Sequence, residues 1–156
     1  MTRCWHGKFS MVVDMRLFFL GLVLLFSHVA AQPAATTIKF NELYTTSIRG
    51  LEFSPKTQEL NGKRVELLGY MAPPLRPRLT FFVLTKTPLA VCPFCSTAAD
   101  WPPDIVVVYL PKGRDMLSTS APLRIKGRLE LGVKEDSETG FVSLIRIYAD
   151  EWSEIR

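Results

Sequence analysis

Apolar and polar residues alternate along the second half of the chain in the pattern of β-strands. The clearest run is Leu123 to Leu131, in which every second residue is apolar or glycine and the residues between are charged. A period of two places one row of side chains in a core and the other row in solvent. Four further runs alternate or are apolar throughout, namely 64–71, 80–85, 105–110 and 141–149. The pattern therefore predicts five strands.

Two of these runs indicate how the strands are arranged. The run Ile105 to Leu110 is apolar at every position, which predicts a central strand covered on both faces. The run Phe141 to Ala149 follows Leu123 to Leu131 after a charged loop, so these two strands are predicted to form a long hairpin. Three glycines stand where strands are able to bend or bulge: Gly69, Gly127 and Gly132.

Five short strands with such glycines predict a small all-β fold with mainly antiparallel pairing. We expect a five-stranded barrel over residues 61–156, similar to the oligonucleotide/oligosaccharide-binding (OB) fold. A sandwich of two sheets is the alternative. The segment Pro111 to Ser120 takes the place of the usual OB helix, but its serine, threonine and glycine predict a loop.

The segment before the barrel, residues 32–60, is predicted to be a leader with a short helical lead-in. Apolar residues between Ile38 and Ser47 stand at helical spacing, and Asn41 is a candidate N-cap, which predicts about one and a half turns of helix. Residues 49–58 are predicted to be a loop. The pair Asn61-Gly62 predicts a tight turn, because glycine readily adopts positive φ.

The N-terminus has the three-part layout of a secretory signal. Basic residues precede the unbroken apolar run Leu17 to Phe26, and small residues follow it up to Ala31. The fifteen residues from Leu17 to Ala31 are fewer than the ~20 that a membrane-spanning helix needs. We therefore predict a signal peptide over residues 1–31 and a periplasmic or secreted mature chain without a membrane span.

The start of translation is left open by this pattern, since Met1, Met11 and Met15 each begin a plausible signal.

Cleavage after Ala31 lowers the net positive charge of the chain, which bears on the kind of partner to expect. The full chain has 156 residues with 19 basic and 15 acidic side chains, and residues 1–31 contain three of the basic and one of the acidic ones. The mature chain is left with 16 basic and 14 acidic residues, a net charge of +2. Such weak basicity argues against a nucleic-acid partner. Its composition, 47% hydrophobic and 22% charged over the full chain, is that of one globular domain.

The same cleavage removes Cys4 and both histidines, His6 and His28, which leaves Cys92 and Cys95 as the only cysteines. The mature chain then has no histidine-dependent nucleophile, no histidine ligand for zinc and no CxxCH haem attachment.

The motif Cys92-Pro93-Phe94-Cys95 is the constellation with intrinsic reactivity. As a metal site, its two thiolates form half of a tetrahedral set for zinc or copper. Asp100, Asp104 or water completes the set, or the same cysteine pair of a second subunit does so in a homodimer. A structural disulfide is the alternative, because exported proteins meet an oxidising compartment.

A third interpretation of the motif is a thiol–disulfide oxidoreductase, in which Cys92 attacks and Cys95 resolves. Such enzymes place the first cysteine at a helix N-terminus, but Pro102 and Pro103 leave little room for a helix after Cys95.

A basic stripe on the clearest strand is the second candidate site. Arg124, Lys126 and Arg128 occupy its outward positions, and Arg146 is expected to join them from the neighbouring strand. Such a row is either the solvated face of an amphipathic strand or a surface for an anionic ligand, a polysaccharide or a lipid headgroup.

Part of the chain resembles an exported bacterial family of unknown function. The resemblance covers roughly Phe40 to Leu110 and rests on the run Leu60 to Pro74, then FFVLT, then a cysteine-bearing loop that leads into DIVVVYL. Members of that family are often encoded beside ABC-type permeases, which implies a role in assisting an ABC-type transport system. The chain departs from the family pattern at Cys92 to Cys95, where a cysteine followed closely by histidine is expected.

Taken together, the residues and the resemblance predict an exported, non-enzymatic binding or accessory protein. The alternative is a thiol–disulfide oxidoreductase that uses the Cys92 to Cys95 motif.

Overall fold

The computed structural model of the chain describes residues 33–48, 50–73, 80–89 and 101–156. The chain separates into two units, Met1–Gln32 and Pro33–Arg156, and every described residue belongs to the second. The predicted signal peptide and the site residues Cys92, Cys95 and Asp100 lie outside the described residues. Among the described residues, no helix has the length and apolar character needed to cross a membrane.

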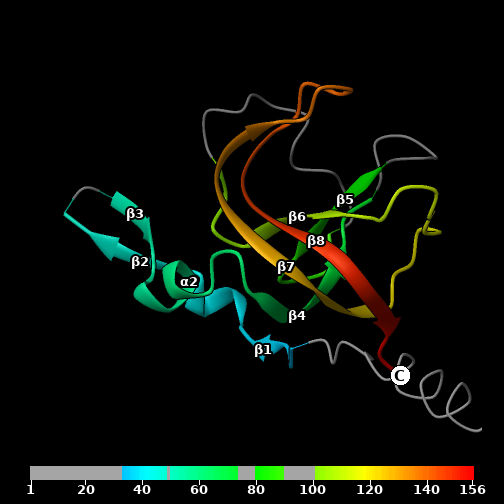
Figure 1. The fold of residues 1–156 in the computed structure, drawn as a ribbon, viewed down its shortest axis with the longest axis horizontal. Helices are drawn as coiled ribbons and strands as arrows, with labels where there is room; N and C mark the ends of the chain where they lie inside the picture. Colours follow the sequence, from blue (N-terminus) through cyan, green and yellow to red (C-terminus); the bar gives the residue numbers. More distant parts are fainter. Residues whose placement is uncertain (1–32, 49, 74–79, 90–100) are drawn as a thin grey trace, which may run out of the picture. The chain divides into compact units, whose positions relative to one another are not determined.

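Strands dominate the described chain, as Figure 1 shows. In chain order they are β1 (Thr36–Thr37), β2 (Tyr44–Ser47), β3 (Gly50–Phe53), β4 (Arg64–Met71), β5 (Phe81–Thr85), β6 (Ile105–Tyr109), β7 (Pro122–Glu135) and β8 (Val142–Glu154). The helical elements of the described residues are a 3-10 turn, η1 (Phe40–Glu42), and a short helix, α2 (Pro55–Glu59). The predicted all-β class is confirmed at this level.

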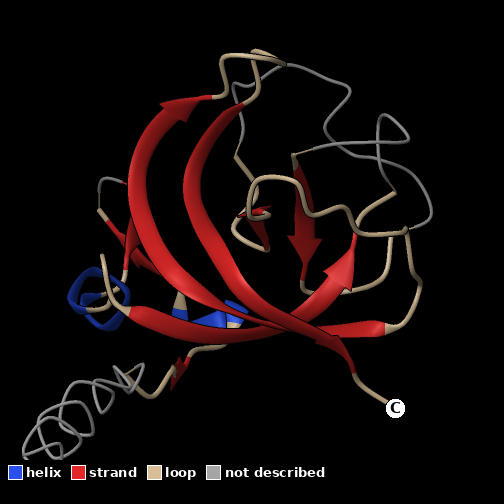
Figure 2. Cartoon of the chain, turned by 45° about the vertical axis from the view of Figure 1, so that its right-hand side comes forward, coloured by secondary structure: helices blue, strands red, loops and turns tan. Residues whose placement is uncertain are grey.

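Six of the strands form one mixed sheet in the order β1-β4-β5-β6-β8-β7, and β4 also pairs with β7. This last pairing closes a near-barrel ring of five strands, whose two longest members, β7 and β8, curve strongly (Figure 2). Two stacked sheets would not close in this way, so the sandwich alternative does not fit. Neighbours in the ring are antiparallel except for β6 and β8, which run parallel.

One main hydrophobic core fills the ring, and it combines the inward rows that the alternation predicts with Ile38, Phe40, Leu43 and Leu60 of the lead-in. Val65 and Leu67 of β4 and Leu123, Ile125 and Leu129 of β7 are all at most 1% exposed. β6 is covered on both faces, as its apolar run predicts. Val106 and Val108 belong to the main core, whereas Ile105 packs in a second cluster with Ala72 and Val83.

Gly127 shows why the ring needs glycine at its bends. A Cβ atom at this position would collide with the carbonyl oxygen of Tyr148 and lie 2.7 Å from Cα of Ala149. The register between β7 and β8 also shifts between Lys126 and Gly127, which marks a bulge. The predicted bend at Gly127 is therefore confirmed.

The lead-in differs from its prediction. Between Ile38 and Ser47 only the 3-10 turn Phe40–Glu42 is helical, in place of the expected one and a half turns, and Glu42 rather than Asn41 caps it by accepting the Lys39 N–H at 2.8 Å. Residues Tyr44–Ser47 instead pair antiparallel with Gly50–Phe53, because threonines favour extended backbone. The predicted loop 49–58 thus contains all of β3 and most of α2.

Candidate functional site: a basic cleft beside β7 and β8

The structure brings one of the two predicted sites into view and leaves the other outside the described residues. Cys92, Cys95 and Asp100 are not described, so the metal and redox interpretations of the motif stay predictions. Asp104 is described and directly precedes β6, where its backbone carbonyl accepts the Lys86 N–H at 3.0 Å. Within the described ranges, no group of three or more histidine, cysteine, aspartate or glutamate side chains is placed to hold a metal ion.

The predicted basic stripe lies on β7, where acidic residues of β4, β7 and β8 interleave with it. The ion pairs are Arg124 Nε to Glu66 Oε1 at 3.6 Å, Lys126 Nζ to Glu151 Oε2 at 3.0 Å and Arg128 Nη1 to Glu130 Oε2 at 3.2 Å. Each cation of the stripe therefore has a carboxylate neighbour, so the stripe is not a uniformly positive surface.

Arg64 of β4 extends this network to the end of β8. Its guanidinium donates to Asp150 at 2.8 Å and to Glu151 at 2.5 Å. Hydrogen bonds from Lys126 and Arg64 lower the pKa of Glu151 below its ordinary value, so Glu151 is ionised at neutral pH. Bonds to two cations fix its position next to the stripe.

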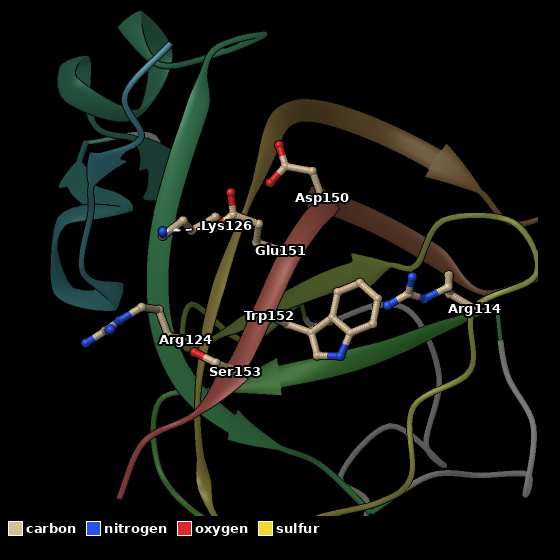
Figure 3. Close-up of a pocket in the computed structure, with 7 residues that line it drawn as sticks. All are labelled: Arg114, Arg124, Lys126, Asp150, Glu151, Trp152 and Ser153. Atoms are coloured by element: carbon tan, nitrogen blue, oxygen red, sulfur yellow. Dashed lines mark hydrogen bonds and ion pairs between the residues drawn. The ribbon is translucent and has the colours of Figure 1, made fainter. Parts of the chain in front are cut away.

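A cleft of about 410 Å³ opens beside this network, and we call it the basic cleft (Figure 3). It combines three cations, two carboxylates and one indole ring. Its lining residues are Arg114, Arg124, Lys126, Asp150, Glu151, Trp152 and Ser153. Two of the three stripe cations on β7, Arg124 and Lys126, therefore line one concave site.

Arg114 differs from the other two cations of the cleft. Its guanidinium carbon lies 5.3 Å from the centre of the Trp152 ring, and among the described residues it forms no ion pair with a carboxylate. An aromatic ring orients the planar guanidinium without using its hydrogen-bond donors. Arg114 is thus held in place with donors available for a ligand.

Arg128 occupies its predicted outward position on β7 but lies outside the basic cleft, whereas Arg146 is placed differently from the prediction. Arg128 does not line the basic cleft, since its guanidinium stacks on Tyr148 with 4.7 Å between guanidinium carbon and ring centre. Arg146 is only 4% exposed and binds Glu130 Oε1 through Nε at 2.7 Å and the Gly132 carbonyl at 2.7 Å. The expectation that Arg146 joins a solvent-facing stripe is therefore wrong.

The buried bonds of Arg146 also change the acidity of its partner. Burial alone would raise the pKa of Glu130, but hydrogen bonds from Arg146 and Arg128 outweigh it and lower the pKa overall. Glu130 is therefore ionised and acts as the structural counter-ion of Arg146, so neither group is available to a ligand.

No family model and no curated protein matches the chain. The crystal structure of a DUF3299 family protein from Pseudomonas aeruginosa PAO1 matches with a TM-score of 0.50 and 16% sequence identity, covering 80% of this chain and 98% of that chain. The two chains share a fold. The predicted resemblance to a family of unknown function thus agrees, at the level of fold, with a structure from such a family.

Proposed function

We propose that the chain is an exported, non-enzymatic binding protein whose OB-like barrel holds an anionic ligand in the basic cleft. The observation that carries this proposal is Arg114, a cation that lies over the Trp152 ring and pairs with no carboxylate of the described residues, in a cleft that also contains Arg124 and Lys126. A guanidinium held by stacking presents a rigid fork that matches a carboxylate or a phosphate.

The strand order of the ring supports the OB-like part of the proposal. When β4, β5, β6, β7 and β8 are numbered one to five along the chain, the ring runs 1-2-3-5-4 and returns to 1. This is the Greek-key order of an OB barrel, a fold built for binding rather than for one chemistry.

OB folds usually bind their ligands on the face of the second and third strands, which are β5 and β6 here. In this chain the outer face of β5 and β6 is covered, which favours the basic cleft as the binding site. Val83 of β5 is 9% exposed, and Ile105 and Val107 of β6 are 2% and 0% exposed. Trp101 and Phe141 pack against this cluster. Most of that face is therefore filled by the chain's own apolar side chains.

The balance of charge in the cleft indicates what kind of anion fits. Arg124 and Lys126 are already paired with Glu66 and Glu151, so a densely charged ligand would be repelled by Asp150 and Glu151. A ligand with one isolated acidic group that binds Arg114 avoids this repulsion. Carboxylates of acidic sugars and phosphates of lipid headgroups share that chemistry.

Three further parts of the proposal rest on sequence. Export follows from the signal-like residues 1–31, and a link to an ABC-type permease rests on the family resemblance alone. Zinc or copper binding by Cys92 and Cys95, within one chain or across a homodimer, rests on the motif. Mass spectrometry of the protein from its native envelope tests the export and the metal site together. An uncleaved N-terminus would contradict export, and a metal-free, fully oxidised cysteine pair would contradict the metal site.

The binding proposal is tested by calorimetric titration of the full chain with digalacturonate and with vesicles of phosphatidylglycerol in phosphatidylcholine. We expect saturable binding in one of these arms and none with a neutral disaccharide or pure phosphatidylcholine. Arg114→Gln should weaken binding about tenfold or more, because a charge-assisted hydrogen bond contributes about 1.5–3 kcal/mol.

The matched control is Lys63→Gln, which removes an exposed cation that lines neither the basic cleft nor any other described cleft. Binding that falls equally in both variants would show a general charge effect and contradict a built site. Absence of binding in both anionic arms would overturn the proposal.

A further inference from the structure

A second cleft, which we call the tyrosine cleft, shares Arg114 with the basic cleft. It encloses about 520 Å³ and is lined by Tyr109 of β6, Tyr148 of β8 and the segment 110–115, with Thr80 and Glu138 beside them. Arg114 lines both clefts, so the two form neighbouring parts of one surface.

The aromatic side of the tyrosine cleft is held rigidly. The rings of Tyr109 and Tyr148 stack with 5.4 Å between centres and 20° between planes, and Phe81 packs 5.4 Å from Tyr109 on β5. Both hydroxyls are anchored, since Tyr109 donates to Asp136 at 3.3 Å and Tyr148 accepts from Lys134 at 2.5 Å. Preorganised rings lose little entropy when a ligand packs against them.

The opposite side of the tyrosine cleft is polar and carries both signs of charge, since Asp115 and Glu138 line it together with Lys112 and Arg114. Lys112 and Arg114 stand on the exposed segment 110–115, and neither forms an ion pair among the described residues. The cleft therefore presents a ligand with the fixed tyrosine pair on one side and, on the other, two cations that are close to carboxylates but form no ion pair among the described residues. A sugar ring that carries a carboxylate combines the matching features, namely apolar C–H groups, hydroxyls and one acidic group.

We infer that the two clefts are consecutive subsites for an extended acidic oligosaccharide, with Arg114 between them. This inference rests on the proposed function and names the ligand class of the same surface. One acidic sugar ring occupies the basic cleft, and a later ring of the same chain occupies the tyrosine cleft.

Two features of the described residues favour a saccharide over other anionic partners. The exposed large apolar side chains that would enter a lipid surface line neither cleft; they are Ile48, Leu51, Leu68, Leu117 and Val133. The carboxylates of Asp150, Glu151 and Glu138 at the clefts oppose a nucleic acid, whose phosphates are closely spaced.

The experiment measures the dissociation constants of the full chain for galacturonate oligomers of two and six rings. Maltohexaose is the neutral arm, a single-stranded deoxythymidine hexamer the nucleic-acid arm, and phosphatidylglycerol vesicles the lipid arm. Two subsites predict that the hexamer binds at least about tenfold more tightly than the dimer, since linked contacts raise the effective concentration. Tyr148→Leu should remove most of this gain.

A second variant keeps the test decisive if Tyr148→Leu fails to melt cooperatively. Lys112→Glu reverses an exposed charge of the tyrosine cleft and should also remove most of the gain, whereas Lys63→Glu should preserve it. Equal affinity for dimer and hexamer would overturn the inference while leaving the proposed function intact. The saccharide assignment would be overturned if neither oligomer bound, or if the deoxythymidine hexamer or the vesicles bound more tightly. The proposed function would be overturned as well only if no anionic ligand bound at all.

Discussion

β7 and β8 approach each other closely at Gly127, and substitution of this glycine should be severe. Because an added Cβ would collide with the Tyr148 carbonyl oxygen, Gly127→Ala forces the two longest strands of the ring apart. We expect the free energy of unfolding in urea to fall by about 3 kcal/mol or more. Leu68→Ala, at a position 43% exposed on β4, is the control. A loss at Gly127 no larger than that of the control would contradict the close approach.

Two tyrosines should make the protein sensitive to high pH. Burial raises the pKa of Tyr44 to about 12, and burial together with Asp136 raises that of Tyr109 to about 12. Both values exceed the value of about 10 for an unfolded chain, so the folded state holds these protons more tightly. The resulting stabilisation is complete below pH 10 and is lost as the pH rises towards 12.

Ultraviolet absorbance titration measures this effect directly. The folded chain should show phenolate formation near pH 12 that decreases in Tyr44→Phe and in Tyr109→Phe. Urea melts of the wild type should show falling stability between pH 10 and 12. Complete tyrosine ionisation close to pH 10 in the folded protein would contradict the burial of these hydroxyls.

Periodicity located the cations of β7 but not the residue that matters most for the proposed site. Arg124 and Lys126 were found because they alternate with apolar residues in a strand. Arg114 stands in an irregular segment where no period exists, and its partner Trp152 is 38 residues further on in the chain. The burial of Arg146 could not be predicted from the sequence either, because alternation does not show that Glu130 and Gly132 bind its side chain.

At the scale of elements, Ser54 joins α2 to the turn η1. Its hydroxyl accepts the Thr57 N–H at 3.1 Å and donates to the Glu42 carbonyl at 2.5 Å. Ser54→Ala removes both bonds and should lower the free energy of unfolding by about 1 kcal/mol. Ser54→Thr retains the hydroxyl and should restore most of the loss. An alanine variant as stable as the wild type would show that this cap does not contribute.

The strands of the ring were predictable because their burial follows a period of two. β4 was predicted with its observed bounds, Arg64–Met71, and the hairpin of β7 and β8 was predicted from alternation and a charged turn. The elements of the lead-in were not predicted correctly, although Ser54-Pro55 is a clear signal for the start of a helix. Alternation is absent from Tyr44–Ser47 and Gly50–Phe53, whose exposure leaves the pairing of these strands unmarked in the sequence.

At the scale of the whole molecule, the core rather than the cysteine pair should sustain the fold. Each fully buried aliphatic side chain contributes ~1.5–3 kcal/mol, and a crosslink over so short a loop contributes at the low end of disulfide effects. The double variant Cys92→Ser/Cys95→Ser should therefore melt cooperatively. Val107→Asp should unfold the protein because Val107 is 0% exposed, whereas Val133→Asp, at a position 76% exposed, should not. Loss of a cooperative melt in the double serine variant would make the pair part of the structural core.

The closure of the ring lay beyond sequence reasoning. The antiparallel pairing of β7 with β8 follows from their short connection, but the parallel pairing of β6 with β8 and the pairing of β4 with β7 join distant segments. Alternation shows which face of a strand is buried and not which strand lies beside it. The basic cleft depends on the same closure, because it combines residues of β7 and β8 with Arg114 from the segment between β6 and β7.

The most direct test of the binding account is a nuclear magnetic resonance titration of the ¹⁵N-labelled full chain with digalacturonate. The indole N–H signal of Trp152 and the backbone amides of Arg114 and Lys126 should shift along one saturable curve. The signal of Trp101, which packs against the core clusters, should stay in place. If the Trp152 signal stays in place at saturating ligand, or if only signals far from the basic cleft move, the cleft is not the binding site.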